Sequence, residues 1–194
     1  IKTLQNPEVR WHAGEALTKI GKNAVPVLIQ ALQNPEVRQY ITEVLARIGE
    51  DAKDAVPALI QTLQDPKGVG RGTIAKALGQ IGEDAVDAVP ALIQTLQNQD
   101  ISVRGNAANV LGQIGEEAVD AVPALTLALQ DLDPEVHQYV AWALGMIGKG
   151  AKDAVPVLIQ ALKDPEVRDS AAKALKKIGT PKALEAVKAY EFLQ

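Results

Sequence analysis

The chain has 194 residues, of which 47% are hydrophobic and only 3% aromatic, and its formal net charge is −4. This composition excludes an intrinsically disordered chain, and the lack of cysteine excludes disulfides, thiolate nucleophiles and cysteine metal sites. There is no long basic run to suit duplex nucleic acid, and no apolar stretch approaches the roughly 20 residues that cross a bilayer. We therefore expect a cytoplasmic protein with neither a nucleic-acid nor a membrane partner.

In chain order, the sequence predicts six pairs of short helices at a nearly constant spacing. Residues 1–5 match the end of the later second helices, so we expect them to be the end of a preceding helix. The pairs are expected near residues 6–33, 34–64, 65–97, 100–130, 133–163 and 164–193. Each pair contains an Ile-Gly step, and the successive glycines are 28, 33, 33, 33 and 31 residues apart: Gly21, Gly49, Gly82, Gly115, Gly148 and Gly179. Such self-similarity is the mark of a repeat architecture.

The first helix of each pair has a start signal and a stop signal. It is expected to begin at an Asn or Asp whose side chain can accept from the first free backbone N–H groups: Asn6, Asn34, Asp65, Asp100, Asp133 and Asp164. It is expected to end at the glycine of the Ile-Gly step, because glycine adopts the left-handed conformation that closes a helix at little cost.

The second helix is expected to restart at a further capping residue: Asn23, Asp54, Asp87, Asp120, Asp153 and Thr180. A proline follows within its first turn, where the missing N–H does no harm. A helix pair of about 30 residues cannot bury its apolar face alone, so neighbouring pairs must stack. The predicted fold is all-α: a right-handed α-α superhelix of about six helix pairs, forming a single solenoid over residues 1–194.

The repeats also resemble a known family. The recurring elements are Pro-Glu-Val-Arg at the start of the first helix, Ala-Leu-Gly-x-Ile-Gly at its end, and Ala-Val-Pro-x-Leu-Ile in the second helix. Over essentially the whole chain they resemble the HEAT repeats of the phycobilisome-lyase (PBS lyase HEAT-like) type, and the artificial HEAT-like repeat libraries based on that type. The resemblance implies a HEAT-repeat solenoid. It also implies that the variable positions of the first helices line a concave surface, because those positions are diversified for binding in the artificial libraries.

Counted backward from each loop glycine, the first helices have two different faces. Positions 12, 8, 5, 4 and 1 are apolar and lie within an arc of about 100°, which predicts an ordinary core stripe. In the second pair these residues are Val37, Ile41, Val44, Leu45 and Ile48. Positions 7 and 3 are mostly small, as at Ala108 and Gly112, and would let a neighbouring helix approach closely.

Positions 10, 9, 6 and 2 form a second arc, the variable ridge, whose residues differ between repeats. It holds the only methionine and all four aromatic residues outside the terminal helix: Trp11, Tyr40, Tyr139 and Trp142. Because Trp, Tyr and Met are enriched at recognition surfaces, the ridge is predicted to bind a partner; the alternative is that these rings fill gaps between repeats. The candidate partner-binding residues are Trp11, His12, Glu15, Gln39, Tyr40, Glu43, Arg47, Lys76, Asn106, Asn109, Gln138, Tyr139, Trp142, Met146 and Lys173.

Two periodic polar rows are interpreted as structural, because a catalytic site is normally singular. The basic row consists of Arg10, Arg38, Arg71, Arg104, His137 and Arg168, and the acidic row of Asp54, Asp87, Asp120 and Asp153. We expect them to cap helices and join repeats. His12 and His137 lack metal-ligand spacing, and the glycines near residues 68–79 lack the other residues of a phosphate loop. No catalytic residue, metal or cofactor is therefore expected.

The leading hypothesis is a non-catalytic protein–protein interaction scaffold that binds a protein or peptide on its concave surface. The alternative, which the family resemblance suggests, is a subunit of a bilin lyase or isomerase complex. A DNA-binding solenoid is disfavoured by the mixed charge of the ridge. We also expect the ridge to carry two aromatic patches separated by a polar stretch, and the terminal helix from Pro181 to act as a polar cap.

Overall fold

The computed structural model describes residues 7–64, 70–131 and 133–192. Within these ranges the chain consists of α-helices and short 3-10 helices, with no strand. It divides into two compact units, Ile1–Ala91 and Leu92–Gln194. The expected helix end at residues 1–5 and the expected caps Asn6 and Asp65 lie outside the described residues. That the six pairs form a single domain stays a prediction.

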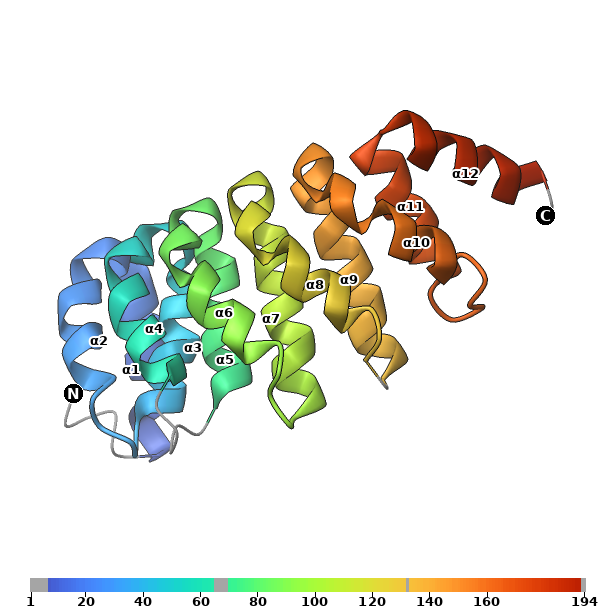
Figure 1. The fold of residues 1–194 in the computed structure, drawn as a ribbon. Coiled ribbons are helices and arrows are strands. Elements are labelled where there is room, and N and C mark those ends of the chain that lie inside the picture. The colour runs from blue at the N-terminus through green and yellow to red at the C-terminus, as the bar shows by residue number, and fades with distance from the viewer. Residues whose placement is uncertain (1–6, 65–69, 132, 193–194) are drawn as a thin grey trace. The chain divides into compact units, whose positions relative to one another are not determined.

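In the first unit, a 3-10 turn joins each first helix to its second helix (Figure 1). The elements in chain order are α1 (Pro7–Ile20), η2 (Gly21–Ala24), α2 (Val25–Ala31), α3 (Arg38–Ile48), η3 (Gly49–Ala55), α4 (Val56–Gln64), α5 (Arg71–Ile81), η4 (Gly82–Ala88) and α6 (Val89–Thr95), which ends in the second unit. The first helices stack side by side, since α3 packs against both α1 and α5. The second helices α2 and α4 form the other layer.

The second unit repeats this arrangement. Its elements are α7 (Ile101–Ile114), η5 (Gly115–Ala121), α8 (Val122–Ala128), α9 (Pro134–Ile147), η6 (Gly148–Ala154), α10 (Val155–Ala161), α11 (Arg168–Ile178) and α12 (Pro181–Phe192). Helix α9 packs against both α7 and α11, α8 and α10 form the second layer, and α12 packs on α10 and α11. The predicted all-helical solenoid architecture is therefore confirmed.

The predicted ends of the first helices are confirmed as well. Each loop glycine has a φ between 61° and 74°, at Gly21, Gly49, Gly82, Gly115, Gly148 and Gly179. Two predicted starts are also confirmed: Asp100 and Asp133 cap α7 and α9, and each accepts from the backbone N–H two residues later, at 2.8 and 2.9 Å. The predicted starts at Asn34 and Asp164 are wrong. Their side chains accept in the same way at 3.0 and 2.9 Å, but in a turn before the helix, and α3 and α11 begin after Val37 and Val167 with no side-chain cap. Both signals act over a few residues, so the sequence alone contains them.

The predicted start of the second helices is wrong for α2, α8 and α10. Their N-termini follow an alanine and have no side-chain cap. The 3-10 turn runs from the loop glycine directly into the helix, so its carbonyl groups accept the first helical N–H groups; Val122, for example, donates to Val119. This backbone bond takes the place of the expected side-chain cap at the start of the helix. Helix α12 begins as predicted, and Thr180 Oγ1 accepts from the Ala183 N–H at 3.3 Å.

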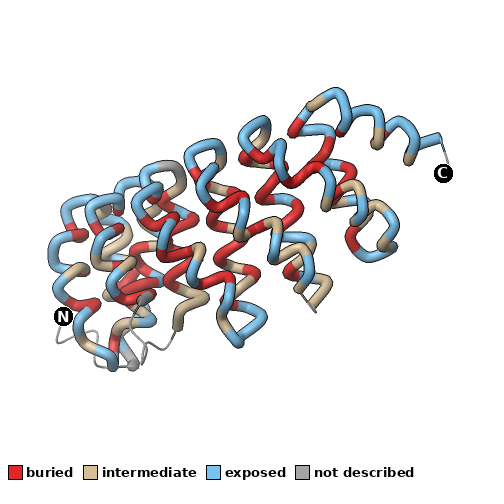
Figure 2. The backbone as a smooth tube through the Cα atoms, viewed as in Figure 1, coloured by how far each residue is buried: buried red, intermediate tan, exposed pale blue. Residues whose placement is uncertain are grey.

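The core lies where the two layers of each unit face each other, as the buried residues in Figure 2 show. Ile41, Val44 and Leu45 of the predicted stripe are fully buried. In α1 the same stripe is less well covered, because Val9 is 39% and Ile20 54% exposed. The second layer also carries one unusual residue, Leu127 of α8, which is 70% exposed.

Candidate protein-binding surface

In the second unit, the aromatic residues of the variable ridge are neither fully exposed nor sealed. Tyr139 and Trp142 of α9 each keep 37% of their surface exposed. The Trp142 ring occupies the space that a Cβ at Gly112 of α7 would need, and the Tyr139 ring lies 3.2 Å from the Cβ position of Gly105. Each ring therefore packs one side on a glycine of α7 and leaves the rest open. Each ring combines features of the two hypotheses: one side fills a gap between helices, and the other side is exposed to solvent.

A hollow of about 470 Å³ lies between α9 and α11, next to the open part of Trp142. It is lined by Trp142 and Gly145 of α9 and by Ser170, Lys173, Ala174, Lys176 and Lys177 of α11. Its floor is narrow because the two helices approach closely there: a Cβ on Gly145 would lie 2.9 Å from the Cα of Ala174. The hollow joins two predicted ridge residues, Trp142 and Lys173, in one concavity.

The charged groups around the hollow are arranged by α11 and α12. Lys176 pairs with Glu191 of α12 at 2.5 Å, and Lys177 Nζ lies 2.8 Å from the sulfur of Met146. Asp169 accepts a hydrogen bond from the Tyr190 hydroxyl at 3.2 Å. Partial burial and this bond to a carboxylate raise the pKa of Tyr190. Lys176 was not among the predicted residues; the signal was a lysine at position 3 before the glycine, where other repeats have small residues.

A smaller hollow of about 100 Å³ lies between α7 and α9. It brings together two predicted residues, Asn106 and Tyr139, beside Ser102 and Glu135. The predicted Asn109 is half-buried on the same helix as Asn106, and Gln138 is exposed, with its amide 3.4 Å from the Glu166 carbonyl. The second unit thus presents two neighbouring concavities along the ridge.

In the first unit the ridge contains one clearly displayed ring. Trp11 of α1 is 57% exposed and meets His12 edge to face, with ring centroids 5.1 Å apart. Tyr40 of α3 behaves differently: its ring lies against Gly14, its hydroxyl donates to the Arg10 carbonyl, and the Arg10 guanidinium stands 5.9 Å from the ring centre. Tyr40 therefore joins α1 to α3 as a packing residue.

The other predicted residues of the first unit are polar side chains at the surface. Gln39 donates weakly to Glu43 at 3.4 Å on the exposed side of α3. Glu15 is half-buried, and the remaining positions are exposed: His12, Arg47 and Lys76. This part of the ridge carries both signs of charge.

Two residues of the basic row, Arg38 and Arg71, cap second helices. Arg38 donates to the Leu32 carbonyl at 3.1 Å and Arg71 to the Leu63 carbonyl at 3.2 Å, each at the C-terminal end of the preceding second helix. Such capping satisfies carbonyl groups that the helix itself leaves without donors. Arg38 and Arg71 therefore have the structural role expected of the row.

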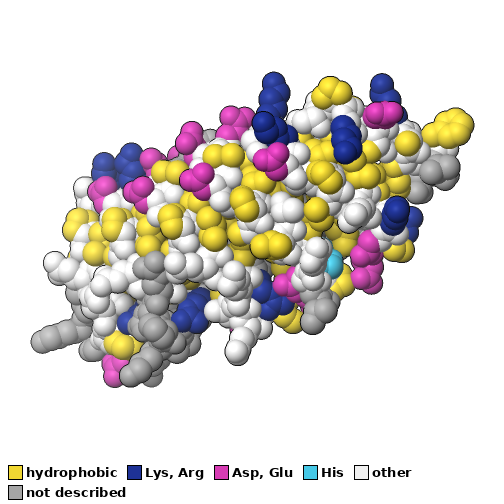
Figure 3. All heavy atoms as spheres, in the orientation of Figure 1, with side chains coloured by type: hydrophobic (Ala, Val, Ile, Leu, Met, Phe, Trp, Pro, Cys, Tyr) yellow, Lys and Arg dark blue, Asp and Glu magenta, His cyan; other side chains and the backbone are white. Residues whose placement is uncertain are grey.

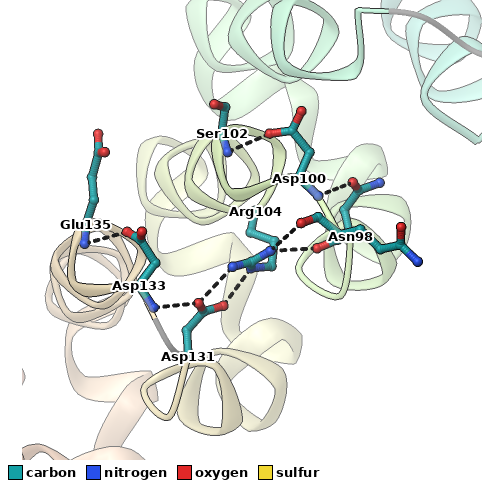
Figure 4. Close-up of polar contacts among 8 residues, drawn as sticks. Asn98, Asp100, Ser102, Arg104, Asp131, Asp133 and Glu135 are labelled. Carbon is teal, nitrogen blue, oxygen red and sulfur yellow. Dashed lines mark hydrogen bonds and ion pairs between the residues drawn. The ribbon is translucent and has the colours of Figure 1, made fainter.

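Arg104 combines such a cap with an ion pair (Figure 4). It donates to the Asn98 carbonyl at 2.9 Å and forms a bidentate ion pair with Asp131 at 2.6 and 2.8 Å, which joins α7 to the loop after α8. The hydrogen bond to Arg104 lowers the pKa of Asp131, and the same bond raises the pKa of Arg104. Both side chains are largely buried, with 14% and 11% exposed. The expected ion pair between repeats is present here, but its carboxylate, Asp131, does not belong to the predicted acidic row.

The acidic row itself stands on the 3-10 turns and is exposed. In Figure 3, charged side chains gather along the edge of the helix pairs, while the second helices between the edges show mostly hydrophobic and uncharged side chains. Pairing on these turns is loose, for example between Lys53 and Asp84 at 3.7 Å, with about half of each side chain exposed. Such pairs contribute little stability.

Replacing His137 by arginine should raise the free energy of unfolding by about 0.5–1 kcal/mol. His137 takes the arginine position in the fifth repeat, and its Nε2 is buried without a hydrogen-bond partner in the described part of the chain. An arginine there is expected to cap α8 and to approach Asp131, as Arg104 does. Thermal unfolding measures the gain, with the exposed His12→Arg substitution as control. A lower melting temperature for His137→Arg would show that the site has no room for the longer side chain.

Within the described ranges, no cluster of three or more His, Asp or Glu side chains is placed to hold a metal ion. No helix of the described chain has both the length and the apolar character needed to span a membrane.

Comparison with known proteins agrees with this architecture. Residues 25–88, 56–128 and 122–190 match HEAT repeats, and residues 9–34 match the PBS lyase HEAT-like repeat. No curated protein sequence matches the chain.

Several solved structures share the fold. One engineered protein is 26% identical, with a TM-score of 0.68 over 87% of this chain and 85% of its own. A second engineered protein is 28% identical, with a TM-score of 0.72; the match covers 96% of this chain but 58% of the other. The crystal structure of Kap121p bound to Nup53p gives a TM-score of 0.71 at 20% identity over 94% of this chain and 23% of that chain, a likeness of fold alone. By its repeats and by its architecture, the chain belongs to the HEAT-repeat family.

Proposed function

We propose that this chain is a non-catalytic scaffold that binds a protein or peptide along the variable ridge. In solenoids, rows of equivalent helices create extended concave binding surfaces, and we assign the ridge to that surface. The observation that carries the proposal is the pair of rings on α9: Tyr139 and Trp142 are held against glycines of α7, yet each keeps 37% of its surface exposed beside a hollow.

This arrangement suits recognition for a physical reason. A ring fixed on one side loses little conformational entropy when a partner covers its other side, so the binding energy is not spent on ordering it. Aromatic anchors next to concavities are the usual centres of binding energy at interfaces. Trp11 is more exposed, and its ring meets that of His12 edge to face, so it is expected to be a secondary anchor.

Alanine at Trp142 is expected to weaken partner binding at least about tenfold. It should also lower stability by about 2 kcal/mol, because about two thirds of the residue is buried and its ring packs on Gly112 of α7. The partners to be tested are peptides selected from a random display library on the immobilised chain, with affinities measured by fluorescence anisotropy well below the melting temperature.

Two control variants separate binding from stability. Ile147→Val removes a methylene from the core side of the same helix and lowers stability without touching the ridge. Phe192→Ala removes the most exposed aromatic ring of the described chain, which lies off the ridge on α12. The proposal predicts that both controls bind normally. If Trp142→Ala bound as well as Ile147→Val, or if the selection yielded no peptide, the ridge would not be the binding surface.

A further inference from the structure

The hollow between α9 and α11 is positively charged, although the chain as a whole carries a net charge of −4. Three of the residues that line it are lysines, and the described residues lining it include no acid. The rest of the lining is an indole ring, a serine and two small residues, Gly145 and Ala174. The hollow therefore combines an apolar floor and wall with a basic rim.

The three lysines are not equivalent. Lys176 is neutralised by Glu191 at 2.5 Å. Lys173 is exposed and forms no ion pair within the described ranges, and Lys177 lies against the sulfur of Met146, which leaves its charge uncompensated. The nearest acid on the same helix, Asp169, is one turn away from Lys173 and holds the Tyr190 hydroxyl. Lys173 and Lys177 thus line the hollow without a carboxylate partner in the part of the chain that the structure describes.

We infer that this hollow binds an acidic peptide segment, in which an apolar side chain sits against Trp142 and flanking carboxylates pair with Lys173 and Lys177. The inference rests on the proposed function and adds the chemistry of the partner. The volume of about 470 Å³ suits one or two side chains, within the range of ordinary ligand pockets. Charge complementarity at such a rim gives selectivity and faster association more than raw affinity.

The neighbouring hollow between α7 and α9 indicates how the bound segment is oriented along the ridge. Its described lining includes Glu135, Asn106 and Tyr139 and no lysine or arginine. A carboxylate placed there would face Glu135 and be repelled. The acidic part of the bound segment therefore lies at the α11 side, and a neutral or polar part lies over Tyr139.

The test uses three peptides of equal length with the same central leucine, flanked by glutamates, by glutamines or by lysines. Fluorescence anisotropy gives the affinity of each for the whole chain. The acidic peptide is expected to bind about tenfold more tightly than the glutamine peptide at low salt, and this preference should shrink as salt is raised. The double variant Lys173→Glu/Lys177→Glu should reverse the preference.

A matched control changes the same charge elsewhere in the second unit. Lys152→Glu/Lys163→Glu alters two lysines that do not line the hollow, and it should keep the preference for the acidic peptide. Thermal melts of both double variants check that the helices remain folded. Trp142→Ala should weaken the acidic and the glutamine peptide by the same factor, since the indole contacts the apolar side chain.

The outcomes separate this inference from the proposed function. If the acidic and glutamine peptides bound with equal affinity, and Trp142→Ala abolished the binding of both, the ridge would still be the binding surface. The inference of an acidic partner would be overturned. If both double variants changed the preference for the acidic peptide by the same factor, the preference would depend on the net charge of the chain and not on the hollow. That result would also overturn the acidic partner. Displacement of the acidic peptide by a single-stranded oligonucleotide of equal charge at lower concentration would identify a nucleic-acid surface instead. Absence of binding by all three peptides would contradict both proposals.

Discussion

Replacing Gly145 by alanine is expected to lower the free energy of unfolding by about 2 kcal/mol, although alanine is the better helix former. In an exposed helix the same change would stabilise by about 0.5–1 kcal/mol. Here the new Cβ would lie 2.9 Å from the Cα and 3.3 Å from the Cβ of Ala174. These atoms belong to the backbone and first side-chain carbon of α11, so α9 and α11 must move apart and lose contact along their whole interface.

The matched control is Gly105→Ala in α7. The nearest atom to its new Cβ would be an edge carbon of Tyr139 at 3.2 Å, and that ring is 37% exposed and able to tilt outward. The control should therefore stay within about 0.5 kcal/mol of the parent. Denaturant titration and thermal melts followed by circular dichroism measure both variants; a loss of about 2 kcal/mol corresponds to roughly 4–8 °C for a chain of this size. If Gly145→Ala were as stable as Gly105→Ala, the close approach of α9 and α11 would be disproved.

Replacing Asp131 by alanine is expected to cost about 2–3 kcal/mol at neutral pH. The substitution leaves the Arg104 guanidinium, which is only 14% exposed, without its bidentate carboxylate, and it also removes the acceptor of the Asp133 N–H. The backbone carbonyls of Asn98 and Gln99 still accept from Arg104, which keeps the cost below that of a fully buried unpaired charge. Denaturant titration of the parent and the variant gives the difference.

The difference should depend on pH in a defined direction. The pKa of Asp131 is lowered in the folded chain, so its unfolded form takes up a proton first as the pH falls. The contribution is therefore complete above the ordinary pKa of an aspartate and is lost as the pH falls through the lower folded pKa. The parent and Asp131→Ala should differ most near neutral pH and converge in strong acid.

Asp84→Ala is the control for this measurement. Asp84 pairs with Lys53 at 3.7 Å, but about half of each side chain is exposed, so its removal should cost less than about 0.5 kcal/mol at any pH. An Asp131 variant that lost no more stability than Asp84→Ala would show that the ion pair in Figure 4 contributes nothing measurable.

Much of the candidate surface followed from the helical period. Counting back from the loop glycine separated the buried positions, such as Leu45, from the ridge positions, such as Trp142. This position count could not predict the hollow, because a concavity depends on how the side chains of two neighbouring helices fill the space between them. Lys176 was missed for the same reason: a wheel drawn for one helix does not show what the neighbouring helix leaves uncovered.

Tyr40 and Tyr139 show where the information in the sequence ends. Both stand nine residues before their loop glycine, and the period assigns them the same role. In the structure Tyr40 lies against Gly14, whereas Tyr139 lies against Gly105. Gly14 and Gly105 occupy different positions in the preceding first helices, seven and ten residues before the glycine. Each ring lies where the neighbouring helix lacks a side chain.

By itself the sequence determined the repeat, the glycine ends of the first helices, the capped starts of α7 and α9, and the face that is buried, because each depends on interactions within a few residues of the chain. It did not determine the starts of the second helices, where the 3-10 turn supplies the acceptors that a capping side chain was expected to provide. Only the tertiary structure decided which ridge side chains pack and which stay open. That choice depends on contacts between residues about 30 positions apart, such as Trp142 with Gly112 and Lys177 with Met146, which pair only when the helices stack.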